Sequence, residues 1–304
     1  MILLVEQFLN GLQYGVTLFL LAAGLTLIFG IMGVINLAHG ALYMVGAFAA
    51  AWTTMQTGNF WIGLPVGLVT AALVGLAMEL AVIRRLYQRD HLDQVLATFA
   101  LILIFNQSVT LIFGRQPLFS QPPALLSGAV EVLPGLPYPA YRLFVIAVGL
   151  AVAVGLYLLI NKTRIGMLVR AGATNRQMVR ALGVDIGRLY SAVFALGALL
   201  AGLAGIMASP ILAVQVGMGE EIILATFVVV VVGGVGSVKG AFVAALVLGM
   251  IDTMLRAFLP GLLQGVMPGP EAQALGVGIS SMGIYLMMAI VLLIRPRGLF
   301  AAGG

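Results

Sequence analysis

The sequence has no cysteine, only two histidines, and few charged residues for its length of 304. Without cysteine it has no disulfide bond, no cysteine-ligated zinc and no thiol nucleophile, and two histidines far apart argue against a histidine-rich metal site. Charged residues make up 8% of the chain, against about 25% in a soluble globular domain. Together with 62% hydrophobic residues, this composition predicts an integral membrane protein.

Catalytic motifs are missing as well. The sequence contains no Walker-type phosphate loop, no HExxH, no nucleophile elbow and no paired intramembrane carboxylates. The stretch GGVGSVKG at 233–240 is rich in glycine and contains a lysine, but it lacks the spacing of a nucleotide-binding loop. We therefore expect a protein that is not an enzyme, with no catalytic residue, cofactor or metal.

Apolar runs dominate the chain, each close to the length of about 20 residues that spans a bilayer. We expect an all-α, polytopic transmembrane bundle of about eight or nine spans, some short or broken, in a single domain over residues 1–304. The two runs beside 233–240 could also form one broken element. The runs lie at about 8–30, 33–53, 60–83, 94–114, 141–160, 190–212, 222–237, 240–258 and 275–294.

The formal net charge is +5, and the basic residues gather in short segments between apolar runs. The positive-inside rule explains this pattern better than nucleic-acid binding does. It places the N-terminus outside, the C-terminus in the cytoplasm and the loop at 115–140 outside, with Lys239 inside. The basic segments that agree on this orientation are Arg84 with Arg85 and Arg89, the stretch 161–190, and Arg295 with Arg297.

The longest polar stretch, residues 161–190, carries six basic side chains and one acid, Asp185. Its pattern predicts a short helix with Thr174 as the N-cap and Gln177 completing a capping box. Gly183 is the expected end of this helix.

The predicted short helix is amphipathic. Met178, Ala181 and Leu182 share one face, while Arg176 and Arg180 lie on the opposite face. A helix of about two turns is not stable alone in water. It must therefore lie on the headgroups of the bilayer or in a groove of a cytoplasmic partner.

Two other segments resemble each other: INLAHGALYMVGAF at 35–48 and VGSVKGAFVAALVLG at 235–249. Each places a basic or imidazole side chain before Gly-Ala and then enters an apolar helix, so they could form a parallel internal repeat. Their glycines predict interrupted helices, which survive at membrane depth only where they are buried in protein or line a watery cavity. Tight turns at the cytoplasmic interface are the alternative. The glycines are Gly30, Gly33, Gly40, Gly233, Gly234, Gly236 and Gly240.

Polar side chains within the apolar runs are costly and mark functional sites. Glu79 lies about one turn before Arg84, where it can snorkel to the interface. Asp252 and Arg256 have the i, i+4 spacing of an intrahelical ion pair. His39 could relay protons, but an interfacial residue that donates to a backbone carbonyl is the simpler interpretation.

Two further polar groups leave alternatives open. Asn106, Gln107 and Ser108 form a cluster within one run, where they could hold helices together or line a pathway. Glu220 and Glu221 begin a helix at its external end, where carboxylates complement the helix dipole. Capping is their favoured role, and contact with an incoming solute or a docking protein is the alternative.

Five blocks of the sequence stand out together: GLTLIFGIMGVINLAHGALYMVGAF (24–48), LATFALILIFNQ (96–107), TRIGMLVRAGATNRQMVRALGVDIGRLYSAVFALGALLAGLAGIM (163–207), VVGGVGSVKGAFVAALVLG (231–249) and RPRGLF (295–300). In these blocks the chain resembles the shorter permease subunit of the branched-chain amino acid ABC importers. The first and third blocks are the most specific, and together the five cover most of the chain in the family's order. Phe99 and Ala100 stand where the family usually carries a glycine after a threonine.

The resemblance implies an importer of two permeases, two ATP-binding cassette ATPases and a periplasmic substrate-binding protein in a bacterial inner membrane. It favours a longer paralogue as the second permease, and it implies that the segment at 163–190 docks in a groove of the ATPase. The residues expected to couple to the ATPase are Thr174, Asn175, Arg176, Met178, Arg180, Ala181, Leu182 and Gly183. The residues expected near a solute pathway are Asn36, His39, Asn106, Gln107, Gly233, Gly234 and Gly236.

Other functions remain open from the sequence. Relatives of such permeases handle other amino acids, amides or urea, and much of the selection is expected in the binding protein. A self-contained ion-coupled transporter or channel would need titratable groups deep in the membrane. Glu79, Asp252 and His39 are the candidates for that role.

Overall fold

The computed structural model describes residues 2–300, apart from the side chains of Arg176 and Gln177. Within that range, seven helices are long and apolar enough to cross a membrane. The protein is therefore a multi-pass membrane protein, as the composition predicts. These helices are α1 (Ile2–Met32), α3 with its continuation (Phe60–Leu86), α5 (His91–Phe113), α6 (Ala140–Lys162), α9 (Ile186–Ala208), α11 (Val238–Leu263) and α12 (Gly269–Ile294).

Two shorter helices complete the bundle, α2 (His39–Thr57) and α10 (Met218–Gly233). Both correspond to apolar runs of the sequence, and most of their side chains are buried. The runs on either side of 233–240 thus form two separate helices rather than one broken element. The α3 helix (Phe60–Met78) passes through a π-helical turn, Glu79–Ile83, into the short α4 (Arg84–Leu86).

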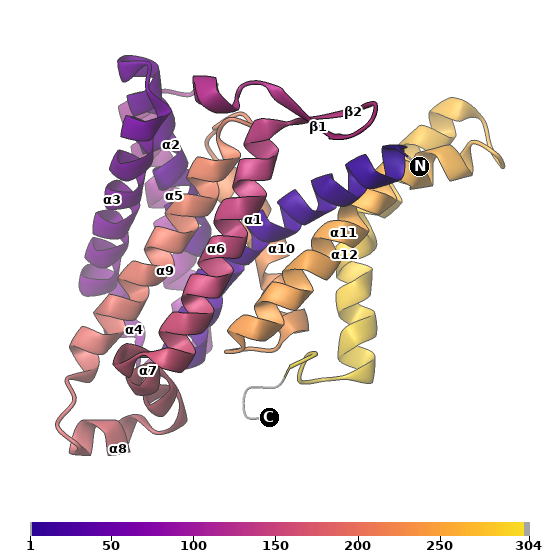
Figure 1. Cartoon of the computed structure of the whole chain (residues 1–304). Helices are drawn as coiled ribbons and strands as arrows, with labels where there is room; N and C mark the ends of the chain where they lie inside the picture. Colours follow the sequence, from indigo (N-terminus) through magenta and orange to yellow (C-terminus); the bar gives the residue numbers. More distant parts are fainter. Residues whose placement is uncertain (1, 301–304) are drawn as a thin grey trace.

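The core is built around α1, which packs along α9 and α11. In Figure 1 it crosses obliquely between the group formed by α2, α3 and α9 and the pair formed by α11 and α12. In the most hydrophobic stretch of α1, 89% of the residues are buried inside the protein, whereas the share in the corresponding stretch of α5 is 17%. The helices α5, α6 and α12 therefore present wide apolar faces to lipid or to another protein.

Glycine at the crossing points lets helix backbones approach one another, as is common between membrane helices. A Cβ on Gly30 would lie 2.7 Å from the Cα of Gly236, so the two glycine-rich segments of the sequence meet in space. Gly40 and Gly219 pack against each other in the same way. A Cβ on either glycine would clash with the carbonyl oxygen of the other.

The loop expected at 115–140 contains structure that the all-α expectation omitted. Strands β1 (Ala129–Leu133) and β2 (Leu136–Pro139) form an antiparallel hairpin after a short 3-10 turn, Ala124–Leu126. Gly135 takes the positive φ of +82° that the turn requires. Strands of five and four residues are too short to stand out in the sequence beside apolar runs of about 20 residues.

Candidate functional sites

The segment at 161–190 forms two helices, α7 (Arg164–Thr174) and α8 (Arg176–Ala181), rather than one. The N-cap of α7 is Thr163, whose Oγ1 accepts a hydrogen bond from the backbone nitrogen of Gly166 at 3.1 Å. Gly166 lies directly against the last carbonyls of α6, where a Cβ would clash. The α7 helix is thus fixed to the end of α6. In Figure 1, α4, α7 and α8 lie at one end of the molecule and the β hairpin at the other.

The expectation that Thr174 caps α8 is wrong. Asn175 is the one extended residue between α7 and α8, and its Oδ1 accepts from the backbone nitrogen of Met178 at 3.0 Å. Thr174 instead ends α7, where its hydroxyl donates to the carbonyl of Arg170 at 3.0 Å. An N-cap residue has a non-helical backbone conformation. Of Thr174 and Asn175, only Asn175 has such a conformation. The side chains of Arg176 and Gln177, and with them the capping box, lie outside what the structure describes.

The expected stop at Gly183 is confirmed. Its φ is +82°, and its backbone nitrogen donates to the carbonyl of Arg180 at 3.0 Å. The nitrogen of Val184 then reaches back to the carbonyl of Val179 at 3.3 Å. This pair of bonds is a Schellman closure, which a left-handed glycine makes possible.

Among the residues that the structure describes, none covers the apolar face of α8. Met178 is 58% and Leu182 76% exposed, and Ala181 and Arg180 are exposed too. Val179, which the sequence analysis did not single out, is the buried contact that holds α8 to the protein. A short helix capped at both ends thus presents large apolar side chains to the outside.

A buried polar network stands beside the α7–α8 segment. Glu79 is wholly buried in the π-helical turn, and its two oxygens bind the guanidinium of Arg84 at 3.1 and 3.2 Å. Tyr87 donates to Glu79 Oε1 at 2.6 Å, and Ser191 of α9 donates to Oε2 at 2.9 Å. Glu79 does not snorkel to the interface as expected. Its partner Arg84 is the side chain that reaches the exterior.

This network links α3 to the start of α9, directly after the α7–α8 segment. Burial, and then the hydrogen bond to Glu79, raise the pKa of Tyr87, so its phenol stays protonated as a donor. Its ring also meets that of Tyr190 edge-on at 5.3 Å. The sequence analysis did not identify Tyr87 or Ser191. The signal of a π-turn that the sequence did contain is the spacing of five residues between Glu79 and Arg84.

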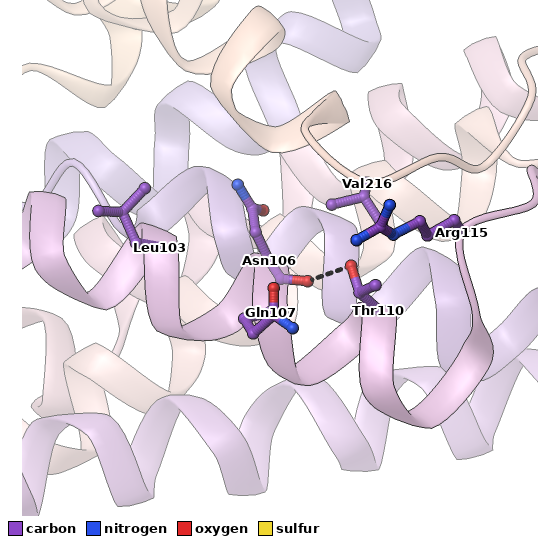
Figure 2. A pocket seen from close by; sticks show the side chains of 6 residues that line it. All are labelled: Leu103, Asn106, Gln107, Thr110, Arg115 and Val216. Carbon is purple, nitrogen blue, oxygen red and sulfur yellow. Dashed lines mark hydrogen bonds between the residues drawn. The ribbon is translucent and has the colours of Figure 1, made fainter.

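At the other end of the molecule, a cavity of about 560 Å³ opens beside the last turns of α5. Figure 2 shows the Arg115 side chain extending back over the end of α5 toward Thr110 and Val216, with Asn106 and Gln107 on the same stretch of helix. Two of the expected pathway residues, Asn106 and Gln107, therefore do line a cavity. Ser108 is not among its lining residues, and its hydroxyl donates to the carbonyl of Ile104 at 2.7 Å. The lining residues are Leu103, Asn106, Gln107, Thr110, Arg115 and Val216.

Glu220 joins this cavity to α10. Its Oε1 accepts a hydrogen bond from Nδ2 of Asn106, which lines the cavity. The N-cap of α10 is Gly217, and within the described residues no side chain caps this end by a hydrogen bond. Glu220 and Glu221 lie in the first turn, where their charge still complements the dipole. The hydrogen bond to Asn106 brings Glu220 next to the cavity wall, and the alternative role considered for it, contact with an incoming solute or a docking protein, stays a prediction.

Among the other expected pathway residues, Gly236 is exposed, and the rest are buried. Asn36 and His39 are wholly buried at the connection between α1 and α2. Ile35 and Leu37 of this connection donate their backbone N–H groups to Gln94 Oε1 at 3.1 Å and Thr98 Oγ1 at 3.3 Å. The extended connection thus runs along the first turns of α5, a helix that continues past Thr98 without a break.

The first interruption lies at membrane depth. Nε2 of His39 is 3.3 Å from the carbonyl oxygen of Leu21, eleven residues before the end of α1 at Met32 and so about 16 Å along the helix. The chain therefore leaves α1 and returns partway into the bundle before α2 begins. Buried polar partners from α5 make such a return possible in a membrane.

The second interruption is a turn near the end of α1, against Gly30. Gly234 packs against the backbone of Phe300, and Gly233 against that of Gly240, so both are enclosed by protein. The two segments that look alike in the sequence thus differ in depth.

Asp252 and Arg256 form the expected intrahelical pair, with Nε and Oδ2 2.8 Å apart.

Several proteins that are similar to this chain along most of its length are named as branched-chain amino acid permeases. The branched-chain amino acid permease BraD of Pseudomonas aeruginosa is 28% identical over 309 residues, covering 97% of this chain and 94% of that protein. LivH of Escherichia coli K12 is 25% identical over 314 residues, with the same coverage. A probable LivH of Methanocaldococcus jannaschii is 28% identical over 300 residues, covering 94% of this chain and 89% of that protein.

The profile of a protein family, described as "Branched-chain amino acid transport system / permease component", matches residues 7–292. The match includes both interruptions, the α7–α8 segment and the residues that line the cavity beside α5. The chain belongs to this family of transport-system permeases.

Proposed function

We propose that this protein is the membrane-spanning permease subunit of an ABC importer that carries branched-chain amino acids across a bacterial inner membrane. Partner ATPases supply the energy, a periplasmic binding protein delivers the substrate, and a second permease, a longer paralogue, completes the channel. The relatives named for branched-chain amino acid transport support the substrate class.

The observation that carries the proposal is the uncovered apolar face of α8. Met178 and Leu182 are exposed on a helix that is capped at both ends. The two sit at the end of the bundle that carries Arg84, Arg85 and Arg89, which the positive-inside rule places in the cytoplasm. A cytoplasmic ATPase groove is the partner that fits: Met178 and Leu182 enter it, and Arg180 meets acids at its rim.

An ion-coupled transporter is the competing function. Two of its three candidate residues, Glu79 and Asp252, are held in ion pairs, whereas Nδ1 of the buried His39 has no hydrogen-bond partner within the described residues. Glu79 is bound by Arg84, Tyr87 and Ser191, and Asp252 is bound by Arg256. Uptake that collapses on ATP depletion but survives a proton uncoupler supports the importer.

Leu182→Asp tests the docking role, with Leu125→Asp as the matched control. Leu125 is 85% exposed in the 3-10 turn at the opposite end of the molecule. We expect Leu182→Asp to lose co-purification of the ATPase and ATP-driven leucine uptake while still inserting into the membrane, because a charge enters an apolar contact. Leu125→Asp should keep both. Normal uptake by Leu182→Asp would refute docking through α8.

Gly183→Trp is a second test at the same place. The position demands a positive φ, which tryptophan rarely adopts, although there is open space around it. We expect Gly183→Trp to abolish transport, while Gly183→Asn, which tolerates this backbone, retains part of it. Equal uptake by the two variants would show that the closure of α8 does not matter for coupling.

A further inference from the structure

The cavity beside α5 has a composition that does not suit contact with lipid. Asn106 lies seven residues before the end of α5 at Phe113, about 10 Å inside the helix end. Gln107 beside it is exposed on the surface of this subunit. Polar side chains at such depth are expensive against hydrocarbon, so this face must meet water or another protein.

One charged side chain lines the cavity, and a side chain of opposite charge is hydrogen-bonded to its wall. Arg115 lines it and has no ion pair within residues 2–300. Glu220 lies on α10 and binds Asn106, another lining residue. An unpaired guanidinium on the cavity wall, and a carboxylate bound to a side chain of that wall, together suit a ligand that carries both charges.

Apolar surface completes the site. Leu103 lies one turn before Asn106 and Gln107 along α5, and Val216 faces them from the segment before α10. Both side chains are aliphatic, which suits an aliphatic substituent rather than a sugar or an amide. The volume of about 560 Å³ is within the range of small-molecule sites.

We propose that this cavity binds the substrate as a zwitterion on its way to the pathway. Arg115 takes the α-carboxylate, Glu220 with Asn106 takes the α-ammonium group, and Leu103 and Val216 receive the aliphatic side chain. This inference rests on the proposed function, in which the second permease closes the open side of the cavity.

The test uses the assembled transporter in proteoliposomes, with leucine-loaded binding protein at saturation. Arg115→Gln and Glu220→Gln each remove one charge from the site. We expect maximal leucine uptake to fall about tenfold in each, since a hydrogen bond to a charged group is lost, while loaded binding protein still stimulates ATP hydrolysis. Glu221→Gln, the exposed neighbour in the same helical turn, is the matched control and should transport normally.

The outcomes separate the two levels of the argument. Uptake by Arg115→Gln within about twofold of the unsubstituted protein would overturn the zwitterion site. A rise confined to the half-saturating concentration of binding protein would also overturn it, because Arg115 would then be a docking contact. Absence of ATP-driven leucine uptake in the unsubstituted transporter would overturn the proposed function itself.

Arg115→Lys keeps the experiment decisive if Arg115→Gln does not assemble. Lysine preserves the charge but cannot bind a carboxylate through two parallel hydrogen bonds. We expect uptake between that of the unsubstituted protein and that of Glu220→Gln. Unchanged uptake by Arg115→Lys, with reduced uptake by Glu221→Gln, would show that the selected charges are the wrong ones.

Discussion

Single glycines decide how closely the central helices pack. Gly205 of α9 lies against the backbone carbonyl of Tyr43 of α2, where a Cβ would come under 3.0 Å. Backbone cannot yield as a flexible side chain can, so a methyl group here must separate the helices. Gly155 of α6 has nothing within 4 Å of the same position. The two glycines look alike in sequence, because each stands in an apolar helix.

We therefore expect Gly205→Ala to lower the free energy of unfolding by about 1–3 kcal/mol through overpacking. Gly155→Ala should be neutral or mildly stabilising, because alanine has the higher helix propensity. Thermal denaturation of the two purified variants in the same detergent measures the difference. Equal melting temperatures would show that the approach of α2 to α9 is not a tight constraint.

Tyr87 shows how one hydroxyl can contribute to the network around Glu79. Tyr87→Phe removes the 2.6 Å hydrogen bond and leaves the pair of Glu79 with Arg84 in place. We expect a loss of about 1–3 kcal/mol, since a buried carboxylate loses a donor. Tyr157→Phe, at an exposed tyrosine of α6, is the control and should not change the melting temperature. A shift of equal size in both variants would contradict the role given to this network.

At the scale of elements, hydrophobic runs located the long helices because each spanning segment needs about 20 apolar residues. The divisions inside the polar segment were harder. α7 and α8 are separated by Asn175 alone, and both Thr174 and Asn175 are side chains that can cap a helix. The hairpin was missed because its strands have only five and four residues, and the π-turn because it shifts the register of an apolar helix by a single residue.

The identity of the α8 cap leads to a paired prediction. Asn175→Ala removes the acceptor for the backbone nitrogen of Met178 and should destabilise α8 by about 1 kcal/mol. ATP-driven uptake should then fall, because the helix is ordered less often for docking. Thr174→Ala removes only a bond within α7 and should have a smaller effect. Should Thr174→Ala prove the more damaging, the cap assignment would have to be reversed.

At the scale of the whole molecule, the sequence could not show which segments meet. The apolar run located Asn106 and Gln107 in a span, and Arg115 directly follows it, but Val216 reaches the same cavity from the distant segment before α10. The carboxylate of Glu220 arrives from a helix 114 positions further along the chain. Asn36 and His39 were equally polar candidates, yet folding buries them between helices. Long-range pairing of this kind leaves no local pattern in a sequence.

The absence of cysteine makes the orientation of the molecule directly measurable, because any introduced thiol is the only one in the chain. Ser127 is exposed before the hairpin, and Arg89 is exposed in the turn between α4 and α5; the two lie beyond opposite ends of α5. The positive-inside rule places Arg89 in the cytoplasm. In cells whose outer envelope has been made permeable, a maleimide that cannot cross the membrane holding this protein should label Ser127→Cys at once. It should label Arg89→Cys only after the inner membrane is opened, and the unsubstituted chain not at all. The reverse pattern would place α8 outside the cell and remove it from any cytoplasmic ATPase, whereas the expected pattern puts the Arg115 cavity on the side from which substrate arrives.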